Sequence, residues 1–101
     1  MYLRPFEAQG GTVNATVTAS SAVLQVNAVP IGNRTIRIAN VGTQTIFVVL
    51  GNSASTASVS TSMPIQAGSV ETFFIRNEIT HVAHIASSTG STIYVTIGEG
   101  A

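Results

Sequence analysis

Apolar and polar residues alternate in short runs along most of this chain, and glycine, proline, asparagine or serine interrupts the runs about every ten residues. A period of two puts every second side chain on the same face of a strand, whereas an amphipathic helix needs a period of 3.6. No segment keeps a helical period for three turns. The pattern predicts strands over residues 12–19, 22–28, 34–40, 44–50, 69–75, 80–86 and 92–97.

The residue types agree with this pattern. Val, Ile and Thr supply 35 of the 101 residues, and β-branched side chains favour strands. Seven to eight short strands at this spacing predict an all-β fold, an antiparallel β-sandwich of jelly-roll type. The length allows one domain, which we place at residues 12–101. Residues 1–11, which end in Gly10-Gly11, are interpreted as an N-terminal arm.

Three segments between the expected strands carry turn or loop signals. Residues Asn40 to Thr43 read as a tight hairpin turn. The stretch 51–62 is rich in Ser, Ala and Thr and is predicted to be a loop with at most one short strand. Residues 63–68 read as a turn in which Gly68 takes a left-handed conformation.

Formal charges are scarce: four Arg, four Glu, no Lys and no Asp, for a net charge of zero. Four Arg balanced by four Glu cannot form the basic field on which nucleic-acid binding through phosphates depends. The absence of cysteine excludes disulfides and thiolate metal sites. No window is apolar enough to span a membrane, and no signal peptide is visible at the N-terminus. We therefore expect a protein assembled in the cytoplasm, without a nucleic-acid or membrane partner and without a cofactor.

A surface with so few charges has little protection against association, which suggests that the protein works inside an assembly. Guanidinium groups and aromatic rings are common in interfaces, and both types occur here in the expected arm, at strand positions opposite the expected core face, or near turns. The candidate interface residues are Tyr2, Leu3, Arg4, Phe6, Arg34, Arg37, Phe47, Phe73 and Arg76.

The two histidines, His81 and His84, invite a metal-site interpretation. Their separation of three residues in a strand points them to opposite faces, so they cannot chelate one ion together. We expect one to be semi-buried and the other to lie at a surface or interface, and their protonation stays open. No activated nucleophile, carboxylate pair or phosphate-binding glycine motif is visible, so an enzyme is not expected.

Three segments carry a family resemblance: residues 37–48 with the turn Asn40-Val41-Gly42-Thr43, residues 63–73 with Pro64 and Ala67-Gly68, and residues 93–100 with Tyr94-Val95-Thr96 and a Gly-Glu-Gly end. They resemble small virion proteins of tailed bacteriophages, and most closely capsid decoration (cement) proteins such as those of Bordetella-type short-tailed phages. The resemblance spans residues 34–100. It implies a jelly roll, homo-oligomers on the outer capsid surface, and non-covalent clamping of neighbouring major capsid subunits, with no catalytic residues.

From the residues and the resemblance together we expect a virion protein on the outer capsid surface whose partners are the major capsid protein and further copies of itself, as a dimer or trimer. Two alternatives remain open at this stage. One is a phage tail or fibre component. The other is a carbohydrate-binding β-sandwich. Such a module needs exposed aromatic platforms, and this chain has only two Tyr and no Trp.

Overall fold

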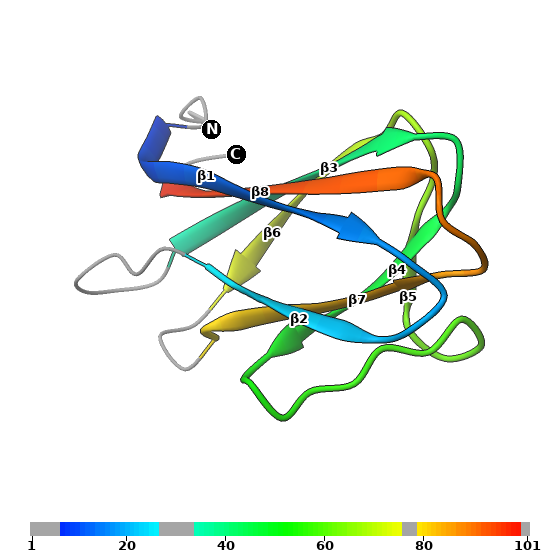
Figure 1. Ribbon diagram of the computed structural model, residues 1–101. Helices are drawn as coiled ribbons and strands as arrows, with labels where there is room; N and C mark the ends of the chain where they lie inside the picture. Colours follow the sequence, from blue (N-terminus) through cyan, green and yellow to red (C-terminus); the bar gives the residue numbers. More distant parts are fainter. Residues whose placement is uncertain (1–6, 27–33, 76–78, 100–101) are drawn as a thin grey trace.

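The computed structural model describes residues 7–26, 34–75 and 79–99, and these ranges fold into eight strands packed as two layers (Figure 1). No helix occurs within them. The strands are β1 (Glu7–Val17), β2 (Ala22–Gln25), β3 (Arg34–Gly42), β4 (Ile46–Gly51), β5 (Met63–Ile65), β6 (Val70–Ile75), β7 (His81–Ala86) and β8 (Ser91–Glu99).

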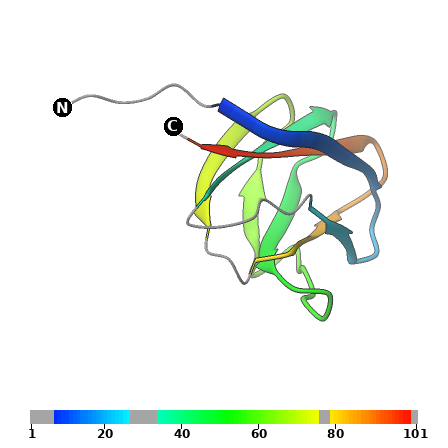
Figure 2. The same ribbon diagram turned by 90° about the vertical axis from the view of Figure 1, so that its left-hand side faces the viewer.

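Both layers are four-stranded and antiparallel. Sheet A has the order β1-β8-β3-β6, and sheet B has the order β2-β7-β4-β5. The chain crosses between the sheets at most connections, and only β4 and β5 are neighbours both in sequence and in a sheet. This is the strand order of a jelly roll, so the predicted fold class is confirmed. Seen from the side, β1 and β8 lie next to each other along one edge of the sandwich (Figure 2).

The first strand starts earlier than predicted. Glu7 pairs with Glu99 and Ala8 pairs with Gly98, so residues 7–11 belong to β1 and not to an arm. The register shifts between Ala8 and Thr12, where the sequence has Gln9-Gly10-Gly11. Glycine is common where a strand takes up an extra residue, so the pair that suggested a hinge lies within an irregular stretch of strand. Residues 1–6 lie outside the described residues.

The predicted hairpin at residues 40–43 is wrong. β3 continues to Gly42, and the next strand, β4, belongs to the other sheet. Gly42 has φ of 146°, and a Cβ at this position would collide with the carbonyl oxygen of Gly90 and with Ser91. The same glycine that could close a hairpin instead lets the chain pass from one sheet to the other at a tight corner.

The turn at residues 63–68 is partly as predicted. Gly68 has φ of 80°, the left-handed conformation expected from the sequence. Residues 63–65, however, form the short strand β5 and pair with β4, which the turn interpretation missed. The stretch 52–62 contains no strand, in agreement with the predicted loop.

Isoleucine and valine fill the space between the sheets. The fully buried side chains come from both layers, and each contributes about 1.5–3 kcal/mol to stability relative to an exposed position. The largest of these apolar side chains are Ile36, Ile38, Ile46, Ile65, Ile93 and Ile97. The core is therefore aliphatic apart from the buried His84, and Phe73 is the one phenylalanine described as packing against it.

A polar contact joins the two sheets at one end of this core. Asn40 of β3 is 1% exposed, and its Nδ2 donates to the carbonyl oxygens of Gln44 and Ile65, each at 2.8 Å. The Ser91 Oγ of β8 donates to the same Gln44 carbonyl at 2.7 Å and accepts from the Gln44 backbone N–H at 2.9 Å. Because Ile65 lies in sheet B, the Asn40 amide fixes the distance between the layers at this corner.

Candidate functional site

The outward side of sheet A is the largest set of described side chains that this chain leaves without its own cover. Cross-strand pairing aligns these side chains in rows, one of which runs Asn14–Tyr94–Ala39–Val70 across β1, β8, β3 and β6. We call this set the A face. Its described members are Thr12, Asn14, Thr16, Thr35, Arg37, Ala39, Val41, Val70, Thr72, Phe74, Thr92, Tyr94 and Thr96.

Large apolar groups are exposed on the A face to an unusual degree. Phe74 is 70% exposed, Val41 and Val70 are each 55% exposed, and Tyr94 is 39% exposed. Single exposed hydrophobic residues are ordinary on a protein surface, but these four share one sheet face, with Val70 and Tyr94 in the same cross-strand row and Phe74 two rows away. A patch of this kind is typical of an interaction surface.

Hydroxyls supply most of the polar character of the A face. Thr12 and Thr96 share a hydrogen bond of 2.7 Å between their Oγ1 atoms, across β1 and β8. Arg37 is the one charged side chain among the described members of the face. A surface of methyl groups, hydroxyls and aromatic rings loses little solvation energy when it is covered, because few charges have to leave water.

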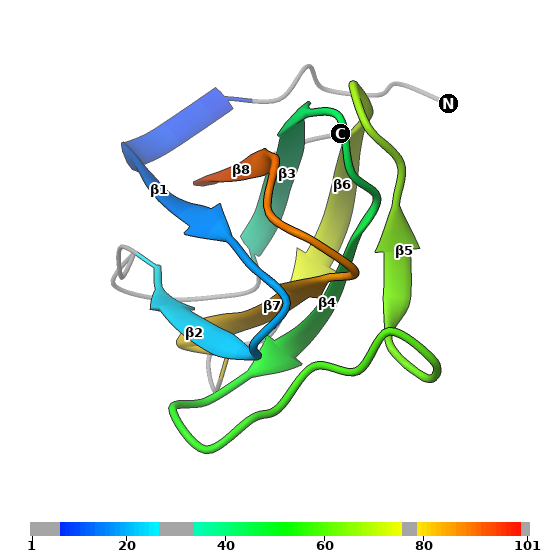
Figure 3. The same ribbon diagram turned by 45° about the vertical axis from the view of Figure 1, so that its right-hand side comes forward.

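The chain itself covers the middle of the outward side of sheet B, whereas Val23 at the edge of the same side is 38% exposed. Ala83 points away from the core, since its neighbours Val82 and His84 point into it, yet Ala83 is 0% exposed. The loop of residues 52–62 crosses this side below β2, β7 and β4 (Figure 3). Ala57 in the loop is buried, and its backbone N–H donates to the Ser21 Oγ at 2.9 Å.

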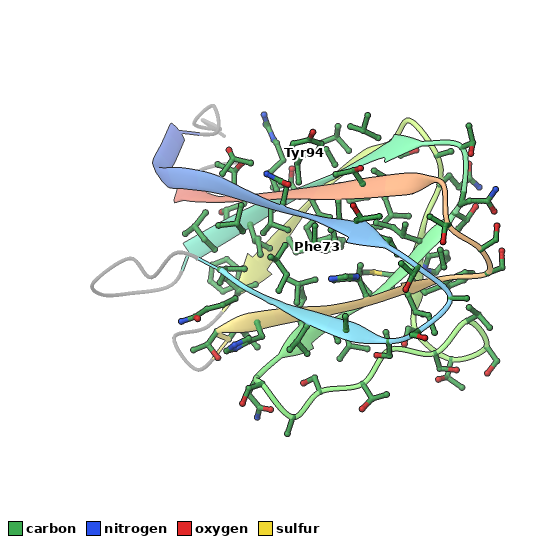
Figure 4. All side chains as sticks on the ribbon, in the orientation of Figure 1. Phe73 and Tyr94 are labelled. Carbon is green, nitrogen blue, oxygen red and sulfur yellow. The ribbon has the colours of Figure 1, made fainter. Side chains whose placement is uncertain are left out.

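Phe73 does not face outward as predicted. Phe73 packs against the core (Figure 4), and Phe74, at 70% exposure, is the exposed ring of β6. The sequence Phe73-Phe74 in a strand must put one ring on each face, and alternation alone does not say which is inside. The pairing of Phe73 with the buried Ile36 decides it. Tyr94, labelled in the same figure, points away from the other sheet.

The other predicted interface residues are divided among several places. Arg37 is exposed on the A face, as a candidate interface residue should be. Phe47 points away from the core, as predicted, but is half-buried on the covered side of sheet B. Arg34 pairs through its backbone with Ile75, and its side chain lies outside the described part of the structure. Tyr2, Leu3, Arg4, Phe6 and Arg76 lie outside the described residues altogether.

Sequence reasoning missed four members of the patch: Val41, Val70, Phe74 and Tyr94. Two of them were visible as a signal, because Val70 and Phe74 alternate with Phe73 and Ile75. The sequence interpretation placed Val70 and Phe74 on the core side of β6, so neither was proposed as an interface residue. Val41 was assigned to a turn, and Tyr94 entered only through the family resemblance.

The two histidines lie on opposite faces of β7, as the odd spacing predicted. His84 is 2% exposed on the core side, and neither ring nitrogen has a hydrogen-bond partner. Burial lowers the pKa of His84 below its ordinary value of 6.5, because a charged ring would lose its hydration. His81 is half-buried, and its Nδ1 lies 2.9 Å from the Thr80 Oγ1. Among the described residues no group of three metal-ligating side chains is present.

Comparison with known proteins gives the fold and no family. No protein-family model and no curated protein matches the chain. A chain from Bacillus endospore appendages, which form disulfide-linked pili, is 17% identical with a TM-score of 0.53, over 89% of this chain and 83% of that one. A protein named PirA is 19% identical with a TM-score of 0.50, over 90% of this chain and 96% of that one.

A third structure, the Tobacco streak virus coat protein, is 9% identical with a TM-score of 0.35, over 94% of this chain and 91% of that one. At 17% and 19% identity, the first two structures show a shared β fold and nothing about activity. Within the described ranges, no helix is long and apolar enough to cross a membrane.

Proposed function

We propose that this chain is a non-enzymatic structural protein of a bacteriophage virion, which binds the outer capsid surface and holds neighbouring major capsid subunits together without covalent links. The A face is the observation that carries the proposal. A small jelly roll that leaves one sheet face with exposed apolar side chains, many hydroxyls and almost no charge is suited to being covered by other protein.

Composition supports the same role. The chain has no cysteine, so any assembly it forms is held by non-covalent contacts. Weak individual contacts are sufficient on a symmetric lattice, because many identical bridges act in parallel. The sequence resemblance to decoration proteins adds the outer capsid surface as the location and the major capsid protein as the partner.

The proposal is tested with phage particles that lack this protein. Purified protein is added, bound protein is measured by co-sedimentation, and capsid strength is measured as the temperature at which packaged DNA becomes accessible to an intercalating dye. We expect saturable binding and a rise of several degrees in that temperature. Saturable binding without any rise, or no binding at protein concentrations of tens of micromolar, would contradict the proposal.

The N-terminal residues are tested in the same assay. Because β1 begins at Glu7, the informative truncation removes residues 1–6 and leaves the strand intact. We expect this truncation to weaken capsid binding or self-association. A truncated protein that decorates capsids with unchanged affinity and heat resistance would contradict a role for these residues, while leaving the role of the A face to be tested separately.

A further inference from the structure

We propose that the A face seats the A face of a second copy of this chain, in a two-fold dimer whose axis runs along the strands between β3 and β8. The inference deepens the proposed structural function, on which it rests, by assigning the surface and the geometry of self-association. It assigns Phe74, Val70 and Tyr94 as the main contacts, in place of the N-terminal aromatic residues that the sequence suggested.

The size of the face is adequate for a specific contact. β3 and β8 are each nine residues long and β6 is six residues long. With about 3.3 Å per residue and about 4.8 Å between strands, the face covers on the order of 500 Å². Two such faces stacked together bury on the order of 1,000 Å², which is where specific protein interfaces begin.

The chemistry of the face suits pairing with itself. Hydroxyl groups both donate and accept hydrogen bonds, so a threonine-rich face can satisfy an identical face. A face dominated by one sign of charge would repel its copy, and this one has Arg37 as the one charge among its described side chains. Sheets stack face to face about 10 Å apart in β-sandwiches, and the same packing between two copies needs no change in the fold.

The strand order determines which strands of the two copies meet across the proposed axis. A two-fold axis between β3 and β8, along their direction, places each β3 over the partner's β8 and each β6 over the partner's β1. Ala39 and Tyr94 are direct cross-strand partners, so the bulky Tyr94 of one copy comes over the small Ala39 of the other, twice. Arg37 comes over Thr96 of the second copy by the same rule, one strand spacing to the side of the partner's own Arg37 position.

The other side of the sandwich is a poorer site for a second copy. The loop of residues 52–62 already crosses the outward side of sheet B, and Ala83 beneath it is fully buried. A partner there would have to displace a segment that makes its own hydrogen bonds, including the one from Ala57 to Ser21. The A face requires no such rearrangement.

The first experiment measures the dimer dissociation constant by sedimentation equilibrium for the full chain and for matched variants. Val70→Glu and Phe74→Glu introduce a charge on the A face, and Val59→Glu introduces the same charge in the loop, where Val59 is 46% exposed against 55% for Val70. We expect the wild type to be dimeric at tens of micromolar. The two A-face variants should weaken dimerisation by at least about 30-fold and Val59→Glu by less than about threefold. Circular dichroism is used to check that all three variants fold.

The second experiment tests the axis by cysteine cross-linking, for which the chain is well suited because it contains no cysteine of its own. Ala39→Cys protein is mixed with Tyr94→Cys protein and treated with a bismaleimide whose spacer matches the distance of about 10 Å between stacked sheets, which is too long for a disulfide. We expect the mixed 39–94 cross-linked dimer to form faster than either like-with-like dimer, because the stacked geometry apposes these two positions. A Val59→Cys protein, mixed with either, serves as the control and should give only the slow background rate.

A monomer at millimolar concentration, a trimer, or a dimer insensitive to both A-face charges would each overturn the inference. Capsid binding by such a protein would leave the proposed function intact. A monomer whose capsid binding is abolished by Val70→Glu would also overturn the inference, by assigning the A face to the capsid protein. A dimer with the expected variants that fails to bind capsids would support the inference and contradict the proposed function.

Discussion

The outward sides of the two sheets both carry apolar residues, but they differ in how far the chain itself covers them. Each carries apolar residues, Val70 and Phe74 among them on sheet A, Ala83 and Phe47 among them on sheet B. On sheet B the chain covers its own surface with the loop of residues 52–62. On sheet A it leaves the surface bare, with Phe74 at 70% exposure. The outward side of sheet B is partly covered within the fold, and the outward side of sheet A is not.

The most direct test of this contrast introduces the same charge at the same kind of residue on each face. Ala83→Asp puts a carboxylate under the loop of residues 52–62, where it has no water and no partner, and should lower the free energy of unfolding by about 3–5 kcal/mol. Ala39→Asp puts it on the open face and should cost less than about 1 kcal/mol. Urea unfolding in dilute solution gives both values, and equal losses would mean that sheet B is not covered.

The polar contact between the two sheets is tested at Asn40. Asn40→Asp keeps the shape of the side chain but replaces the Nδ2 donor with an oxygen that faces the carbonyls of Gln44 and Ile65. We expect a loss of about 2–4 kcal/mol in unfolding free energy, since two hydrogen bonds become repulsive contacts in a buried site. Thr72→Asn, an exposed change on β6, is the control. A loss below about 1 kcal/mol for Asn40→Asp would show that the layers do not depend on this contact.

His84 predicts how stability changes with pH. Its pKa is lowered in the folded state by desolvation, so the unfolded chain binds a proton more readily. Stability from this group is therefore complete above the unfolded pKa of 6.5 and falls as the pH is lowered through that value towards the folded pKa. The expected observation is a midpoint of urea unfolding that declines below about pH 6.5.

His84→Leu should remove that decline and raise stability at neutral pH by about 1–2 kcal/mol, because it also removes a buried N–H without a partner. His81→Gln, on the other face of β7, is the matched control and should retain the decline. If His81→Gln removes the decline and His84→Leu does not, the decline does not come from His84 and the prediction is wrong.

The smallest effect is expected at the loop that covers sheet B. Ser21→Ala removes the acceptor for the Ala57 backbone N–H and should cost about 0.5–1.5 kcal/mol. Proteolysis in the stretch 52–62 should become faster, since the loop loses one attachment. Ser53→Ala, in the exposed part of the same loop, is the control. Unchanged proteolysis in Ser21→Ala would indicate that packing alone holds the loop in place.

Much of the fold followed from alternation and turn residues. The period of two over residues 34–40, 69–75 and 80–86 predicted strands that the structure contains, and Gly68 was predicted to be left-handed. The site was predicted less well, because a strand with apolar residues on both faces does not show which face is inside. Phe73 and Phe74 are the clearest case, and cross-strand pairing with Ile36 decided between them. The polar contact between the sheets links Asn40 to Ile65 and Gln44 to Ser91, pairs that are far apart in sequence and left no local signal.

The sequence by itself determined that the chain is all β, that its strands are short and aliphatic, and that its surface carries few charges. These properties depend on local periodicity and composition, which act within a few residues. The tertiary structure decided which strands share a sheet, which phenylalanine is buried, and which of two apolar faces remains open. Each of those outcomes depends on pairing between distant strands and on the path of one loop, and neither pairing nor path is encoded in any single segment.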